Sequence, residues 1–114
     1  MEIKRGDVFL VDLNPVMGTE QSGIRPALII QIDKANKNSP HTIIIPFTTK
    51  IGKAVLPSHV NIPAGVGGLA KDSVLLCEQI RVIDKKRIVS KMGNIGAENI
   101  QAVAAAIRVI LGLD

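Results

Sequence analysis

Short runs of β-branched and large apolar residues, separated by proline, glycine and asparagine, recur through most of this 114-residue chain. The clearest are VFLVDL, PALIIQI, TIIIPFTT and SVLLCEQIRVI. Such runs are typical of strands, and the turn residues between them predict short connections. Only Ala97–Leu111 places apolar residues at the three- and four-residue steps of a helix. The order predicts a mainly β domain, a small barrel or curled antiparallel sheet, with a C-terminal helix packed against it.

The proline and glycine residues also predict where the strands, loops and helix begin and end. Pro46 interrupts the third strand, which predicts a sheet edge or a bulge there. Gly96 and Gly112 are the expected helix boundaries. Loops are expected at residues 16–24 and 33–40, and the segment AGVGG reads as a glycine-rich connection. Strands are expected at residues 8–13, 26–32, 42–49, 59–62, 73–83 and 87–93.

Size and composition restrict the class of protein. A chain of 114 residues can bury one compact core, so residues 1–114 are expected to form a single domain. A hydrophobic share of 46% and a mean hydropathy of +0.30 favour an oligomer. Fourteen Lys and Arg against ten Asp and Glu suit a polyanionic partner such as nucleic acid. Charges scattered through MEIKRGDVFLVDL argue against a signal peptide, and no apolar run reaches membrane-spanning length, so a cytoplasmic protein is predicted.

Several kinds of catalytic site are not indicated. His41 and His59 lie in different segments without companion ligands and are expected to be surface or loop residues. The single Cys77 is expected to be a buried, inert thiol. AGVGG is not followed by GK[ST], and no GxSxG occurs. The sequence therefore predicts neither a metal site nor a cofactor.

A set of polar residues at strand ends and in adjoining loops remains. In a small barrel these positions can converge on one rim, where function is common, but solvated charges and β-forming threonines on an exposed strand would look the same. RNA cleavage would give the set a chemical meaning. RNA carries its own nucleophile, the 2′-OH, and needs donors around the phosphorus, which arginine and threonine supply. The set is Glu20, Gln21, Arg25, Thr48, Thr49, Ser73, Glu78 and Gln79.

The opening segment KRGDVFLVDLNPVMGTEQSGIRPALII is similar to that of the MazF/PemK-type toxin endoribonucleases. The shared features are a (K/R)RGD(V/I) strand, a D-L-x-P turn, a G-x-E-x-x-G loop and an R-P pair. The similarity continues through IIIPFTTK, LPSHVNI and GLAKDSVLLCEQIRVIDKKRI, and so covers residues 4–88. The resemblance implies a homodimer of small SH3-like barrels, a fold class shared by CcdB-like and PemK-like toxins. It also implies cleavage of single-stranded RNA without a metal, leaving a 2′,3′-cyclic phosphate and a 5′-hydroxyl, under restraint by an antitoxin with an acidic tail.

The resemblance also assigns roles to residues. The family's catalytic arginine and threonine match Arg25 and Thr48. A guanidinium stays protonated, so Arg25 is expected to stabilise the phosphate and the leaving group, with Thr48 donating to a non-bridging oxygen. Glu20 is the candidate for assisting 2′-OH deprotonation. Some relatives carry an aromatic residue at the loop position that Met17 occupies here. The expected RNA-binding residues are Arg5, Gly18, Gln21, Gly23, Thr49 and Gln79.

Two rival functions stay open on sequence grounds. One is a non-enzymatic inhibitor of the same fold, like the gyrase-poisoning toxins, which lack the R-P and T-(T/S) pairing present here. The other is an RNA-binding or assembly module in which Arg25 and Thr48 are structural. Loss or retention of RNA cleavage in an Arg25 variant separates these functions from a nuclease.

Overall fold

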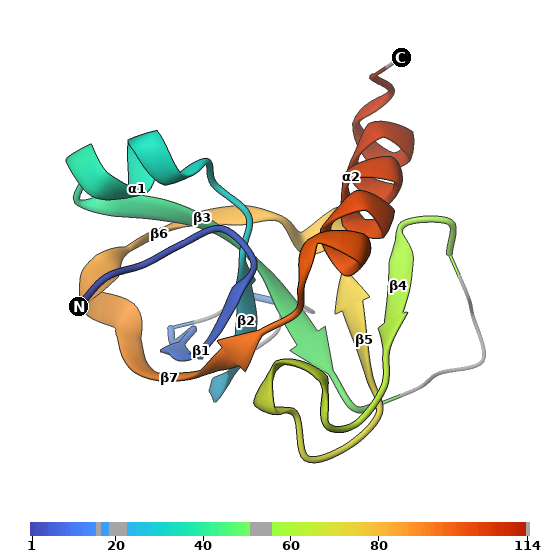
Figure 1. The fold of residues 1–114 in the computed structure, drawn as a ribbon, viewed down its shortest axis with the longest axis horizontal. Helices are drawn as coiled ribbons and strands as arrows, with labels where there is room; N and C mark the ends of the chain where they lie inside the picture. Colours follow the sequence, from blue (N-terminus) through green and yellow to red (C-terminus); the bar gives the residue numbers. More distant parts are fainter. Residues whose placement is uncertain (16, 19–22, 51–55, 114) are drawn as a thin grey trace.

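A computed structural model describes residues 1–15, 17–18, 23–50 and 56–113 of the chain. The described strands pair into one antiparallel sheet, and a single long helix, α2, stands against it (Figure 1). No helix in this part of the chain has the length and apolar character needed to cross a membrane. The strands are β1 (Asp7–Asp12), β2 (Ile24–Ile29), β3 (His41–Thr48), β4 (His59–Ile62), β5 (Ser73–Leu76), β6 (Arg81–Asp84) and β7 (Ile88–Asn94). The helices are α1 (Asp33–Asn38) and α2 (Ala97–Leu111), with 3-10 turns η1 (Val66–Gly68), η2 (Cys77–Gln79) and η3 (Lys85–Arg87).

The sheet brings together strands that are distant in sequence. Its order is β4-β5-β3-β2-β1-β7, and β6 pairs with the first half of β3. All the ladders are antiparallel. The prediction of a mainly β fold with a C-terminal helix is confirmed, and the helix has the expected bounds.

Alternate residues along the strands fill two cores, one on each face of the sheet. This division follows from the period of two along a strand, which sends successive side chains to opposite faces. One cluster includes Val8, Leu28 and Phe47 and packs with Val103 of α2. The other is centred on Phe9 and Ile44, both fully buried. The helix α2 packs its one apolar face against the first cluster, and its other faces are polar or exposed.

The prediction of one long strand at residues 73–83 is wrong, because the turn η2 divides this segment into β5 and β6. β5 pairs with the end of β3, where Phe47 lies opposite Leu75, whereas β6 pairs with its first half, where Ile44 lies opposite Arg81. More chain therefore runs from Leu75 to Arg81 than β3 offers between Ile44 and Phe47. The surplus forms the 3-10 turn that carries Glu78 and Gln79.

The expected edge or bulge at Pro46 is also wrong. β3 is an interior strand, and Pro46 pairs opposite Ala27 of β2 without a register shift. On its other side β3 changes partner, from β6 at Ile44 to β5 at Phe47. A residue without an N–H is tolerated at this change of partner, since a ladder bond is interrupted there in any case.

The segment 33–40, expected to be a loop, contains the short helix α1. Its anchor is polar, which is why the apolar pattern gave no sign of it. The Asn36 side chain is buried, and its Oδ1 accepts from the Thr42 hydroxyl at 2.7 Å and from Gln31 Nε2 at 3.0 Å. Asn36 Nδ2 donates to the Gln31 carbonyl at 2.9 Å. An amide network fixes α1 in place of apolar packing.

Candidate active site

Arg25 lies inside a strand, whereas the sequence places the start of that strand one residue later. β2 begins at Ile24, and Arg25 stands opposite Val11 of β1. Pro26 lies opposite Leu10 on the β1 side, before the pairing of β2 with β3 begins. The missing N–H of the proline therefore costs no bond to β3, and its ring holds Arg25 in an extended conformation.

A hollow of about 170 Å³ brings together Arg25 and Thr48, two of the three residues expected to be catalytic. The half-buried Arg25 reaches across to β3, where its Nη1 donates to the Phe47 carbonyl at 3.5 Å. This contact places the guanidinium one residue away from Thr48. The hollow is lined by Arg25, Pro26, Phe47, Thr48, Thr49 and Ser73.

Thr48 is held so that its hydroxyl can donate. Its side chain is largely buried, and Oγ1 accepts the backbone N–H of Lys50 at 3.1 Å. A hydroxyl can accept and donate at once, so this bond orients the oxygen and leaves its hydrogen for a ligand in the hollow. Ser73 is buried beside it and donates to the Lys71 carbonyl at 2.9 Å. Arg25 and Thr48 thus offer a guanidinium and a hydroxyl to one small space, which suits a phosphate group.

The other expected RNA-binding residues are spread more widely. Thr49 is exposed at the hollow. Gly18 and Gly23 adopt positive φ in the β1–β2 loop, as loop-forming glycines do. Glu20 and Gln21 lie outside the described residues.

Arg5 and Gln79 are placed away from this hollow. The residue after Arg5, Gly6, donates to the carbonyl of Ile29, at the opposite end of β2 from Arg25. At about 3.3 Å per residue, four steps along β2 put roughly 13 Å of strand between the two positions. Gln79 lies in η2 and is not among the described residues that line the hollow.

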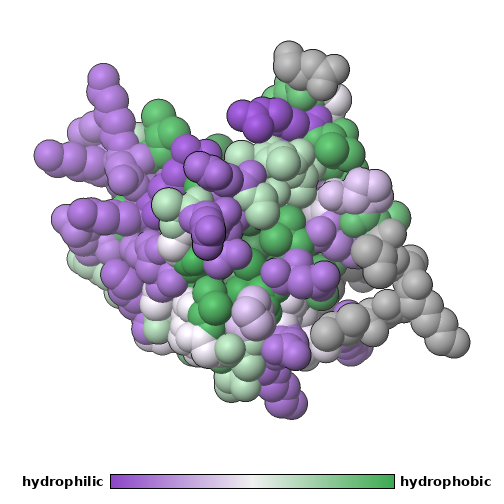
Figure 2. Space-filling view, turned by 45° about the vertical axis from the view of Figure 1, so that its right-hand side comes forward, coloured by the Kyte–Doolittle hydropathy of each residue, from purple (hydrophilic) through white to green (hydrophobic). Residues whose placement is uncertain are grey.

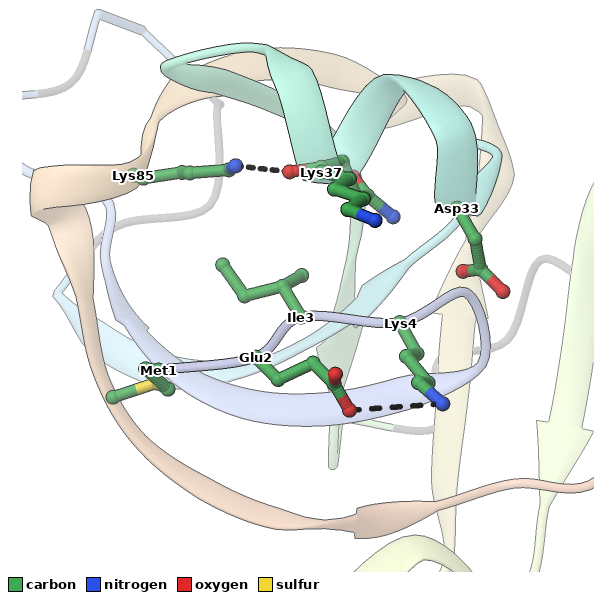
Figure 3. A pocket seen from close by; sticks show the side chains of 8 residues that line it. Met1, Glu2, Ile3, Lys4, Asp33, Lys37 and Lys85 are labelled. Atoms are coloured by element: carbon green, nitrogen blue, oxygen red, sulfur yellow. Dashed lines mark hydrogen bonds and ion pairs between the residues drawn. The ribbon is translucent and has the colours of Figure 1, made fainter.

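A larger hollow, of about 330 Å³, lies between α1 and the N-terminal residues (Figure 3). Several of its polar groups are used within the protein. Lys4 pairs with Glu2 at 3.6 Å, Lys85 Nζ donates to the Asn36 carbonyl, and Asp33 accepts the backbone N–H of Arg5 at 2.7 Å. The smaller hollow at Arg25 is the better candidate because its donors converge. The larger one is lined by Met1, Glu2, Ile3, Lys4, Asp33, Asn36, Lys37 and Lys85.

Apart from the hollow at Arg25, one polar cluster has a geometry that the sequence did not predict. Glu78 accepts from the Ser58 hydroxyl at 3.0 Å and lies 2.9 Å from His59 Nε2. His59 Nδ1 accepts the Leu56 N–H at 3.4 Å, so in the neutral ring Nε2 carries the hydrogen and donates to Glu78. The expectation that His59 is a surface or loop residue is wrong, since it begins β4 and its side chain is 16% exposed. The contact between His59 and Glu78 could not be predicted from the sequence, because β4 and η2 approach each other only in the folded chain.

This cluster shifts the titration of its carboxyl group. Burial raises the pKa of Glu78, but hydrogen bonds from His59, from the Glu78 backbone and from Ser58 outweigh burial and leave it below the ordinary 4.5. Burial, aided by the negative charge of Glu78, raises the pKa of the Cys77 thiol to about 11. A thiol that stays protonated is a poor nucleophile, so Cys77 is unsuited to covalent chemistry. Among the described residues, no three His, Cys, Asp or Glu side chains are grouped to hold a metal ion.

Glu78→Gln should destabilise the protein at neutral pH and have progressively less effect in acid. The folded pKa of Glu78 lies below the unfolded one, so the carboxylate favours the folded state above pH 4.5, and this contribution is lost as the pH falls through the folded pKa. Urea unfolding of both proteins from pH 7 to pH 3 measures the difference. Glu2→Gln, at an exposed carboxylate, is the control. A difference that stays constant across this range would contradict the assignment.

Comparison with known proteins places the chain among toxins. A family model described as PemK-like, MazF-like toxin of type II toxin-antitoxin system matches residues 4–111. Endoribonuclease EndoA of Bacillus subtilis (strain 168) is 47% identical over 113 residues, which cover 99% of this chain and 97% of the relative. A crystal structure of MazF from Deinococcus radiodurans superposes with a TM-score of 0.84 at 25% identity, covering 98% of both chains. A mycobacterial endoribonuclease in complex with its cognate antitoxin has a TM-score of 0.81 at 20% identity, covering 98% of this chain and 97% of that one, and supports the fold alone.

Proposed function

This chain belongs to the PemK-like, MazF-like toxin family of type II toxin–antitoxin systems, and from that premise we propose that it is an endoribonuclease that cleaves single-stranded RNA. Cleavage occurs at a short sequence, needs no metal ion, and leaves a 2′,3′-cyclic phosphate and a 5′-hydroxyl. The observation that carries the proposal is the hollow in which the Arg25 guanidinium and the Thr48 hydroxyl meet. Cutting messenger RNA in this way inhibits translation and growth.

The chemistry needs only what RNA and these side chains bring. The 2′-oxygen attacks the adjacent phosphorus, a P–O2′ bond forms and the P–O5′ bond breaks. Two negative charges gather on the phosphorane oxygens at the transition state, where the forked donors of Arg25 and the hydroxyl of Thr48 stabilise them. Both donors are fixed before RNA binds, by the Phe47 carbonyl and the Lys50 N–H, so little reorganisation is needed during the reaction.

Two protons must also move. The 2′-hydroxyl proton passes to a base, a role we assign to Glu20 on its match to the family's loop motif. The departing 5′-oxygen takes a proton from water. Arg25 stabilises its developing charge by hydrogen bonding, because a guanidinium stays protonated and so serves neither as a general acid nor as a general base. RNA binding is assigned to the loop residues Gly18, Gln21 and Gly23 together with Arg5, Thr49 and Gln79, with Gln79 as the candidate for contact with a base edge.

Incubation of the pure protein with a long unstructured RNA in EDTA is expected to give new ends at one short sequence. Sequencing of the 5′ ends and chemical identification of the 2′,3′-cyclic phosphate measure the outcome. Arg25→Ala is the matched control for a contaminating nuclease. Binding of RNA without cutting would favour the RNA-binding module, and gyrase-dependent DNA damage after induction, without RNA cleavage, would favour the inhibitor of the same fold.

The assembly is part of the same proposal. We assign the chain to a homodimer of SH3-like barrels. Apolar residues exposed at the end of α2, where hydrophobic surface is visible in Figure 2, support the self-association. An antitoxin with an acidic, disordered tail suits a toxin with a net charge of +4, as does RNA itself. The substrate and the translation machinery place its action in the cytoplasm. The exposed residues are Val109, Ile110, Leu111 and Leu113.

A further inference from the structure

The side chain of Arg87, in η3, reaches the base of the β1–β2 loop. Its Nη1 donates to the carbonyl oxygen of Asp12 at 3.1 Å and also to the carbonyl oxygen of Asn14. The partners are separated from Arg87 by 75 and 73 residues in sequence, so only the folded sheet brings them together. A single guanidinium nitrogen thus holds two carbonyls of the turn that leaves β1.

The same turn is closed by a network of hydrogen bonds. The Leu13 N–H donates to the Gly23 carbonyl at 3.0 Å, and the Gly23 N–H donates to Asn14 Oδ1 at 3.1 Å. The Asn14 N–H donates to Asp12 Oδ1 at 3.0 Å. These bonds tie the two ends of the loop to each other, and Arg87 ties the closed base to η3.

This base is the backbone from which the candidate catalytic arginine projects. Arg25 follows Gly23 by two residues and lies opposite Val11 of β1. Val11 in turn lies opposite Ile88 of β7, the residue directly after Arg87. Arg87 therefore stands at the end of a row in which β7, β1 and β2 are paired side by side. Any shift of the loop base against η3 would be passed to the start of β2.

We propose that Arg87 is a positioning residue for RNA cleavage, which holds the base of the β1–β2 loop so that Arg25 is presented to Thr48 in a fixed position. The proposal rests on the proposed nuclease function. Arg87 acts through its backbone partners and does not need to touch the substrate. Arginine suits this role because its planar group offers fixed donors to two neighbouring carbonyls, whereas an ammonium is a compact, strongly hydrated charge.

Arg87→Met tests the proposal because it keeps much of the side-chain stem and removes the donors. We expect kcat for an RNA substrate to fall about 10- to 100-fold, the scale on which a remote mutation acts when it misplaces a catalytic group by about 1 Å. KM and its dependence on salt should stay close to the wild-type values. Lys86→Met is the matched control, since it removes the same charge from the neighbouring exposed position and should leave kcat unchanged.

A direct phosphate contact by Arg87 would give a different result. Loss of such a contact raises KM, lowers the salt slope of binding by about one, and changes kcat little. That pattern would overturn the positioning role and leave RNA cleavage itself established. A wild-type protein that does not cut RNA would instead refute the proposed function.

Amide hydrogen exchange supplies a readout that is independent of activity. In Arg87→Met, the N–H groups of Leu13 and Gly23 should exchange faster. The N–H groups of Leu28 in β2 and Ile45 in β3, which lie opposite each other, should keep their protection. Arg87→Lys should restore protection and kcat in part, and it serves as the test variant if the methionine variant does not fold. Unchanged exchange at Leu13 and Gly23 in a folded variant would overturn the proposal.

Discussion

Arg25→Ala is expected to lower kcat for RNA cleavage by about 10²- to 10³-fold, the usual effect of removing one preorganised donor from a developing oxyanion. The fold should be kept, because Arg25 is half-buried and its side chain makes a long hydrogen bond to the Phe47 carbonyl rather than filling the core. KM should change less than kcat, since the lost donors act chiefly on charge that forms in the transition state. Steady-state cleavage of a short RNA that contains the recognised sequence measures both constants.

Two further variants test how Arg25 acts and whether Thr48 acts on the same group. Arg25→Lys keeps the charge but loses the forked geometry, so it should recover only part of the lost rate. Thr48→Val removes the second donor. If the two donors act on one phosphorane, combining Arg25→Ala with Thr48→Val should cost less than the product of the single effects. Full activity of Arg25→Ala, or strictly multiplicative effects, would contradict a shared site.

Local patterns in the sequence were sufficient for much of the fold. The continuous apolar runs in VFLVDL and TIIIPFTT identify strands because both faces of these strands are buried, one in each core. The helix at Ala97–Leu111 has the expected bounds, since glycine precedes it and ends it at Gly112 in the left-handed conformation. The pairing of Arg25 with Thr48 came from the family's motifs, and the register of β2 against β3 now gives it a structural cause.

Features that depend on distant contacts could not be predicted in this way. The apolar run SVLLCEQIRVI looks continuous, yet it turns at η2 because its two halves pair with different parts of β3. His59 and Glu78 approach only when β4 meets η2, and Arg87 reaches Asp12 only when η3 is placed beside β1. None of these partners is close in sequence. Residue type alone therefore gave no reason to connect them.

Gly68→Ala is expected to destabilise the protein by about 3–5 kcal/mol, a large part of the roughly 5–15 kcal/mol by which a domain is stable. Gly68 has φ of +76°, and a Cβ built on it would lie 2.3 Å from the backbone oxygen of Met92 in β7. That oxygen belongs to a paired strand, so the contact cannot be relieved by rotating a side chain. Two costs therefore add at this position: positive φ for an L-residue, and displacement of η1 from β7.

Gly65→Ala separates these two costs within the same connection. Gly65 also has positive φ, +92°, but no described atom lies within 4 Å of its added Cβ. It should lose only about 1–2 kcal/mol, the conformational penalty alone. At roughly 4 °C per kcal/mol for a domain of this size, Gly68→Ala should melt well below Gly65→Ala. Equal Tm values for the two variants would show that η1 can move away from β7 at no cost, and that the close approach at Met92 does not hold this side of the sheet together.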